Sequence, residues 1–204
     1  CSGDRHVLIE MHAHTKSHSA CSHIDPVELV RQARKKGLQG IILTEHHYLW
    51  GEDELAELKR CSEAEEYFVL LAAQEVDTDV GHVLVYGADR SIEEKMSLDE
   101  LRSAYPDAAL VWAHPLRDGR IPAEERLMDP RFDGIEIFSS NHTQLENYYG
   151  LRLWHRYKFT AISGSDTHAV ETAGILPSQF DHPVSTIEDV VTELKSGRCR
   201  PFYK

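Results

Sequence analysis

Histidine, aspartate and glutamate residues follow five apolar runs of the sequence, at or just beyond the point where each run ends. These residue types bind divalent metal ions through imidazole nitrogen and carboxylate oxygen, a donor set that suits zinc, manganese or iron. A carboxylate among them can bridge two ions of a multinuclear site. The five groups are His12 and His14; Glu45, His46 and His47; Glu75 and Asp77; His114; and Asp166 and His168.

The spacing inside two of these groups favours a shared ligand. His12 and His14 stand two residues apart, as do Asp166 and His168, and residues at this spacing point to the same side of an extended backbone. A single histidine at a strand end is more often a hydrogen-bonded structural residue than a ligand. Five such groups in one chain favour a metal site, because the structural interpretation must explain each group separately.

The rest of the sequence predicts strands that alternate with helices, the pattern of a parallel sheet built from right-handed βαβ units. The carboxyl ends of parallel strands meet at one edge, where the following loops build active sites. We therefore expect the five groups at one edge. Strands are predicted over 7–9, 40–44, 68–73, 82–86, 109–113, 134–138 and 159–162, and helices over about 26–37, 52–66, 98–105, 143–157 and 186–196.

Composition limits the partners and the surroundings of the protein. Its 204 residues fit a single domain over 1–204. The formal net charge of −12 argues against an extended nucleic-acid surface, which needs a basic face. The four cysteines lack C-x-x-C spacing, which indicates reduced thiols and a cytoplasmic location. No run reaches the roughly 18 apolar residues of a membrane helix, so no membrane partner is expected; the oligomeric state stays open.

Seven short motifs between residues 10 and 168 resemble, in their order, those of the PHP (polymerase and histidinol phosphatase) family. They are His12-x-His14-Thr15, Ser19-Ala20-Cys21-Ser22, Leu43-Thr44-Glu45-His46, Gln74-Glu75, Gly81-His82-Val83-Leu84, Ala113-His114-Pro115 and Gly164-Ser165-Asp166-Thr167-His168. No single motif is unique, but the ordered set is specific. The resemblance implies a distorted seven-stranded (β/α) barrel, TIM-like and of PHP type. It also implies a metal-dependent phosphoesterase that hydrolyses a phosphate ester with a metal-bridged hydroxide.

The resemblance further implies which residues hold the two or three divalent ions. His82 opens a predicted strand, so only the resemblance places it in the site. The implied ligands are His12, His14, Glu75 and Asp166 for a first ion, Glu75, His82 and His114 for a second, and His46 and His168 for a third.

Two departures from the family pattern affect this assignment. Glu10 replaces the aspartate that commonly precedes the first motif, and its side chain can still accept a hydrogen bond behind the ligands. The family usually supplies an aspartate or histidine seven or eight residues after the first histidine, where this chain has Ser19 and Ala20. The third ion therefore lacks its usual remaining ligand. His18 or His23 could replace that ligand, and each could equally be a solvated loop residue.

Catalysis by this site would use Asp166, His168 and Arg117. Arg117 would bind the substrate, because a guanidinium binds phosphate oxygens in pairs. His168 or His18 could supply the proton that a leaving alkoxide needs. The expected substrate is a small phosphorylated molecule, with nucleotides among the candidates.

Three further polar residues near these motifs are interpreted as structural. Cys21 is more typical of a small loop-packing residue than of a ligand. His47 adjoins His46 at a strand end, so the two rings should point apart. Arg131 could bind phosphate, but an ordinary surface arginine is the favoured interpretation.

Two other functions stay open. An amidohydrolase-type metal hydrolase also places an H-x-H motif after its first barrel strand, but it often bridges its ions with a carboxylated lysine. No lysine of this chain occupies such a position, and Glu75 takes the bridging role instead. The other alternative is a non-catalytic PHP module that keeps metal for structure, against which the nearly complete ligand set argues.

Overall fold

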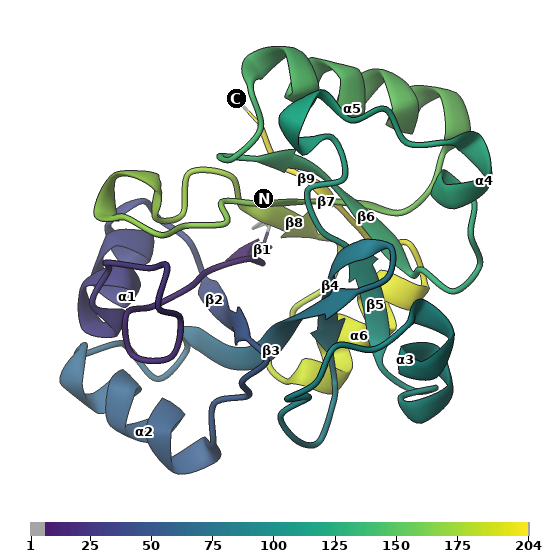
Figure 1. The fold of residues 1–204 in the computed structure, drawn as a ribbon. Helices are drawn as coiled ribbons and strands as arrows, with labels where there is room; N and C mark the ends of the chain where they lie inside the picture. The colour runs from purple at the N-terminus through teal and green to yellow at the C-terminus, as the bar shows by residue number, and fades with distance from the viewer. Residues whose placement is uncertain (1–6, 204) are drawn as a thin grey trace.

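A mixed sheet of nine strands forms the centre of the computed structural model, which describes residues 7–203 (Figure 1). The strands are β1 (Val7–Glu10), β2 (Gly40–His46), β3 (Val69–Thr78), β4 (Gly81–Tyr86), β5 (Ala109–Trp112), β6 (Gly134–Ser139), β7 (Ala161–Gly164), β8 (Ser178–Phe180) and β9 (Cys199–Pro201). Their order across the sheet is β7-β6-β5-β4-β3-β2-β1-β8-β9. The sheet curls into a nearly closed barrel, because Ala13 beyond β1 pairs with Thr167 beyond β7.

Helices connect the strands and pack against the barrel (Figure 1). They are α1 (Pro26–Lys35), α2 (Glu52–Cys61), α3 (Leu98–Ala104), α4 (Glu124–Leu127), α5 (Gln144–Tyr157), α6 (Ile187–Lys195) and the 3-10 turns η1 (Arg117–Gly119) and η2 (Val170–Thr172). Capping side chains start three of them: Asp25, Ser97 and Thr143 each accept a backbone N–H of the first turn. Thr186 starts α6 in the same way, because its side chain accepts the Asp189 N–H.

Apolar side chains fill the inside of the barrel, as they do in other closed barrels of this width. Helix α6 packs against β4 and β5 and adds Val190 and Leu194 to this inner core. Along β3, Leu71 packs against the inner core and Ala73 belongs to it. Two residues further on, the same face of β3 carries Glu75. The strand that builds the core therefore also carries a carboxylate into the site.

The sheet differs from the prediction in strand direction and in strand number. The β3–β4 and β4–β5 pairs are antiparallel, and so are both pairs that β8 makes. Strand β3 runs on to Thr78, and the chain reverses directly into β4 at Gly81, whose φ of 110° suits glycine. The prediction of seven strands is wrong, because β8 and β9 add to the sheet. Each of these two has only three residues, too few to show a period.

The extra length of β3 also corrects the positions of two site residues. Glu75 and Asp77 lie inside this strand rather than after it. In the register, Glu75 stands opposite His46 of β2, and Asp77 stands opposite His82 of β4. Neighbouring strands therefore bring these side chains together sideways, across the sheet.

Two predictions from composition can be compared with the structure. Within residues 7–203, no helix is both long enough and apolar enough to cross a bilayer. Cys21, Cys61 and Cys199 are free thiols, and Cys1 lies outside the described residues.

Candidate metal centre

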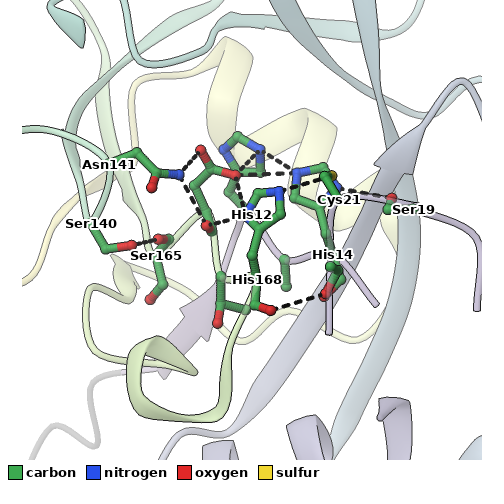
Figure 2. A network of polar contacts seen from close by, with 12 residues as sticks. His12, His14, Ser19, Cys21, Ser140, Asn141, Ser165 and His168 are labelled. Atoms are coloured by element: carbon green, nitrogen blue, oxygen red, sulfur yellow. Dashed lines mark hydrogen bonds and ion pairs between the residues drawn. The ribbon is translucent and has the colours of Figure 1, made fainter. Parts of the chain in front are cut away.

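All eight predicted ligand residues meet in one cluster. His12 and His14 follow β1, His46 ends β2, His114 follows β5, and Asp166 and His168 follow β7, while β3 and β4 supply Glu75 and His82. Their donor atoms form three overlapping groups, and within each group all atoms lie within 4.8 Å of one another. The groups are His12, His14, Glu75 and Asp166; Glu75, His82 and His114; and His14, His46 and His168. Figure 2 shows the polar network that joins His12, His14 and His168 to their neighbours.

A buried glutamate on β6 orients the imidazole of His12. Nδ1 of His12 lies 2.9 Å from Oε1 of Glu136, and both side chains are fully buried. A carboxylate can only accept, so the Nδ1–H of His12 donates to it and Nε2 of the neutral ring keeps its lone pair. The other oxygen of Glu136 accepts the backbone N–H of His114 at 2.7 Å. One carboxylate thereby holds two of the candidate ligand segments.

A relay through a serine orients His14 in the same sense. Oγ of Ser19 donates to Oε2 of Glu45 at 2.5 Å, so it can accept only from Nδ1–H of His14, at 3.2 Å. The lone pair of His14 is again on Nε2, which lies 3.1 Å from Nε2 of His12 (Figure 2). Two lone pairs at this separation repel each other unless a proton or a cation lies between them.

Glu75 lies at the centre of the cluster and is almost completely buried. Its Oε1 lies 2.7 Å from Nδ1 of His82 and 3.0 Å from Nε2 of His114. Its Oε2 lies 3.0 Å from Nε2 of His14 and 3.3 Å from Nδ1 of His46. The two oxygens therefore face different groups of imidazoles, which is the arrangement of a bridging carboxylate.

Asp166 completes the first group of donors from a strained position of the backbone. Its φ is 46°, in the left-handed region. Nδ2 of Asn141 donates to Oδ2 of Asp166 at 2.5 Å (Figure 2). The other oxygen, Oδ1, lies 3.2 Å from Nε2 of His14 but makes no hydrogen bond of good geometry within the described chain. A buried carboxylate oxygen without a donor, facing two imidazole lone pairs, fits a divalent cation.

The carboxylates make this cluster attractive to positive charge. Burial alone would lower the pKa of His14, but the adjacent carboxylates of Asp166 and Glu75 outweigh it and raise that pKa to about 9. Burial would also lower the pKa of His12, but three carboxylates raise it well above its usual range; they are those of Asp166, Glu136 and Glu75. Burial would raise the pKa of Glu75, yet the neighbouring imidazoles hold it well below its usual value. Protons and a metal ion neutralise the same carboxylates, so a bound ion must displace protons.

The third group is less enclosed than the other two. The side chains of His46 and His168 are 30% and 28% exposed. Burial is the main cause that lowers the pKa of His46, to about 4. Nδ1 of His168 lies 2.9 Å from the backbone oxygen of Asp166, which leaves Nε2 facing Sγ of Cys21 at 3.1 Å (Figure 2). Cys21, which the sequence suggested as a packing residue, is exposed and touches a candidate ligand.

Neither proposed substitute for the missing ligand reaches the cluster. Nε2 of His18 lies 3.1 Å from Oε1 of Glu54, and its ring stacks on Tyr48 with centroids 3.8 Å apart. His18 therefore faces α2, and its suggested role as a ligand or proton donor is wrong for this structure. His23 is exposed, and its backbone N–H donates to the carbonyl oxygen of His168.

Three other interpretations agree with the structure. His47 points away from His46, with its Nδ1 lying 2.7 Å from the backbone oxygen of Ile92. Arg131 pairs with Asp129 and Asp99, at 2.6 and 2.7 Å, as a surface arginine does. Glu10, fully buried, accepts the backbone N–H of His12 at 3.0 Å and therefore supports the ligand segment from behind. Burial raises the pKa of Glu10 to about 7, although the hydrogen bonds that its carboxylate accepts act to lower this pKa.

Sequence reasoning missed Glu136 and Asn141. Glu136 carried a signal, because it is the one charged residue in the predicted apolar strand 134–138, and a buried charge needs a partner. Asn141 carried none, since an amide after a strand is common in loops. Ser19 stood at the position where a ligand was expected, and it supports His14 instead.

A pocket of ≈ 460 Å³ opens beside the second group of donors. Arg117 lines it together with His82 and His114. The guanidinium is half-buried, and its Nε lies 3.8 Å from the carboxylate of the adjacent Asp118. Arg117 is therefore placed to bind an anion that also reaches the cluster, whereas Arg131 does not line this pocket.

Solved structures that share this fold include three similar along most of the chain. PsfC from Pseudomonas syringae has a TM-score of 0.70 at 15% identity, over 98% of this chain and 92% of that one. A proposed metal-dependent phosphoesterase from Bifidobacterium adolescentis has a TM-score of 0.59 at 18% identity, over 91% and 95%. An amidohydrolase from Chromobacterium violaceum with bound sulfate and no metal has a TM-score of 0.64 at 17% identity, over 91% and 96%.

These identities show a common fold and nothing finer. The fold is thus one that a protein described as a metal-dependent phosphoesterase and a protein described as an amidohydrolase share. No protein-family model matches the sequence, and no curated protein matches it either.

Proposed function

We propose that this protein is a metal-dependent phosphoesterase of the PHP type. The observation that carries the proposal is the set of three overlapping donor groups, in which Glu75 belongs to two and His14 belongs to two. Shared donors of this kind suit a multinuclear site, and multinuclear sites serve phosphate ester hydrolysis because they can neutralise several oxygens at once. The ordered motifs of the sequence support the same class.

The donor groups suggest how the ions would be distributed. The three groups would hold one ion each, of zinc, manganese or iron, with the third ion the least enclosed. When bound, these ions would lower the pKa of water and neutralise charge on the phosphate.

The side chains around the ions would bind and orient the substrate. Arg117 would bind two phosphate oxygens from the pocket side, next to His114. Asp166, fixed by Asn141 through Oδ2, would present Oδ1 as the acceptor for a proton of the attacking water. His168 keeps Nε2 available because its Nδ1 donates to the backbone of Asp166. That nitrogen would serve as a ligand in the neutral ring, or would protonate the leaving oxygen from the doubly protonated ring.

The pocket supports a small substrate rather than a polymer. Its ≈ 460 Å³ lies within the range of small-molecule sites, about 300–1,000 Å³. A nucleotide would fit this volume. The net charge of −12 argues against a long polyanion, whose binding depends on a broad basic face.

An amidohydrolase activity is the second candidate, because one structure with this fold is an amidohydrolase. The central residue of the cluster supports the phosphoesterase class over the amidohydrolase class. A carboxylated lysine would be expected to bridge the ions of many amidohydrolases, whereas Glu75 takes the central position in this chain.

Metal analysis combined with two substrate panels tests the proposal. The purified protein should bind two or three equivalents of Mn²⁺ or Zn²⁺ by mass spectrometry of the eluted metal, and should then hydrolyse p-nitrophenyl phosphate. It should not hydrolyse p-nitrophenyl acetate or N-acyl amides at a comparable rate. Arg200→Gln, on the exposed face of β9, is the matched control and should behave as the wild type. Bound metal without turnover of any phosphomonoester or diester would contradict the proposal.

A further inference from the structure

The pocket beside His82 and His114 changes from buried to exposed along its wall. His114 is 5% exposed, Arg117 is 32% exposed at its side chain, and Arg120 and Lys95 are exposed. These four residues all line the same pocket. The candidate metal ligands therefore form its inner end, and two cationic side chains stand at its mouth.

Among the residues that the structure describes, no carboxylate holds the two cations at the mouth. Within residues 7–203, neither Lys95 nor Arg120 has an aspartate or glutamate oxygen within 4 Å. The acidic residue of the lining is Asp77, which lies 3.0 Å from Nε2 of His82 and 3.4 Å from Nε2 of His47. Its charge is thus engaged by imidazoles. In a chain with 34 acidic and 22 basic residues, two free cations beside one pocket are an uneven distribution.

Both cations stand on segments that the structure fixes to the site. The N–H of Arg117 donates to the His114 carbonyl oxygen at 3.2 Å, and the N–H of Gly119 donates to Oε1 of Glu146 at 2.7 Å. These two bonds anchor the turn that ends at Arg120. Next to Lys95, the N–H of Met96 donates to the backbone oxygen of Asp77. The fold therefore fixes the backbone positions from which these two side chains extend.

Apolar side chains also contribute to the lining of this pocket. Trp112, Ile121 and Pro122 line it, and the Trp112 ring is held by stacking on Phe132, with planes 3° apart and centroids 5.6 Å apart. Such a wall suits a carbon skeleton, which loses little by leaving water.

We propose that the substrate is a compact phosphate monoester with a second anionic group, which Lys95 and Arg120 bind while Arg117 and the metal centre bind the phosphate. This proposal rests on the proposed function and narrows its substrate class. The second anion is a carboxylate or a second phosphate. Hydrolysis would consume one water, break the phosphorus–oxygen bond of the ester, and release inorganic phosphate and the alcohol or phenol with its second anion intact.

Matched aromatic phosphates test the proposal on the metal-loaded protein. 4-Carboxyphenyl phosphate carries the second charge, and 4-carbamoylphenyl phosphate is its neutral counterpart of the same shape. We expect a kcat/KM ratio of about 10 in favour of the carboxylate, about 1.4 kcal/mol, and expect most of it in KM. 1,4-Phenylene bisphosphate distinguishes the two anions: a larger preference for it than for the carboxylate assigns the second group as phosphate.

Charge removal at the mouth shows whether these side chains cause the preference. In the double variant K95Q/R120Q the kcat/KM ratio should fall to about 1. Comparing the ratio of the variant with the ratio of the wild type cancels any difference in leaving-group reactivity between the two substrates. Arg200→Gln removes an exposed arginine on β9 and should keep the full ratio. A wild-type ratio near 1, or an unchanged ratio in the double variant, would overturn the proposal.

The failure of the substrate class and the failure of the proposed function give different results. If phenyl phosphate is hydrolysed and the ratio is near 1, the function stands and the second-anion site does not. If no phosphate is hydrolysed, the function fails, and calorimetric binding of 4-carboxyphenylphosphonate against its carbamoyl counterpart decides the site alone. Tighter binding of the carboxylate that is lost in K95Q/R120Q supports the second-anion site, and equal binding rejects it.

Discussion

The inner and outer imidazoles of the cluster are held in different ways. His12 and His14 are fully buried. The carboxylate of Glu136 fixes the tautomer of His12 directly, and the carboxylate of Glu45 fixes the tautomer of His14 through Ser19. The outer pair, His46 and His168, is about a third exposed. Nδ1 of His168 bonds to a backbone carbonyl oxygen, and a free thiol touches its other nitrogen.

This difference predicts how tightly each ion would bind. A ligand that is already held in its coordinating tautomer loses little entropy on binding and gains basicity from the carboxylate behind it. The side chain of a partly exposed ligand has to be immobilised by the ion, and water competes with this side chain for the same coordination position. The inner donors should therefore hold metal through purification and dialysis, whereas an ion at the outer pair should exchange.

Removal of an inner ligand should have the largest effect. His12→Ala deletes a donor of the first group and leaves Glu136 buried with one partner fewer. We expect at least one equivalent of metal to be lost, and phosphatase activity to fall by more than about 100-fold. Metal analysis and kcat/KM on p-nitrophenyl phosphate measure both. Full metal content in this variant would contradict the assignment of the inner group.

Removal of the carboxylate behind an inner ligand should have the next largest effect. Glu136→Gln keeps the shape of the side chain but makes it a weaker acceptor for Nδ1–H of His12. Metal affinity should fall by about 10–100-fold, measured by competition with a chromophoric chelator.

Glu10→Gln is the matched control for that variant, because Glu10 is equally buried but bonds to backbone and Ser165 rather than to an imidazole. It should lower the free energy of unfolding and keep the metal affinity within a few-fold. If both variants lost affinity equally, the effect would come from general packing and not from the orientation of His12.

Changes to the outer pair should be smaller. Cys21→Ser removes the thiol next to Nε2 of His168 and leaves every donor of the first two groups in place. We expect loss of less than one equivalent of metal, only from the exchangeable fraction, and a fall in activity of less than about 10-fold, below the range for inner support residues. Loss of the tightly held ions in this variant would erase the distinction between inner and outer sites.

The sequence predicted the donors of the cluster better than the frame that holds them. His12, His14, His114 and Asp166 stand out because each follows an apolar run. His82 needed the resemblance, since the antiparallel β3–β4 pair that sets it opposite Asp77 cannot be distinguished by periodicity from a parallel crossover. A sequence shows the residue types at strand ends, whereas the direction of a strand depends on where the intervening turn closes.

Residues that support ligands through a second contact were the hardest to find. Glu136 lies in the middle of a buried strand, 124 residues from its partner His12. The side-chain contact between Glu136 on β6 and His12 after β1 explains why a charge is tolerated there. In the sequence, Ser19 could be noticed only because it stands where a ligand was expected. It donates a hydrogen bond to Glu45, which lies 26 residues further along the chain.

The smallest effect is expected at His18, where the sequence and the structure disagree. Its ring stacks on Tyr48 and its Nε2 lies 3.1 Å from Glu54, so it belongs to the contact with α2 and not to the metal centre. His18→Ala should leave metal content and kcat/KM unchanged and should lower the free energy of unfolding by about 0.5–1.5 kcal/mol, the range of an aromatic pair. Metal analysis and urea unfolding on one preparation separate the two outcomes. If the third ion were lost while stability stayed constant, His18 would move into the cluster on metal binding, and the outer pair would have the ligand that it lacks in sequence.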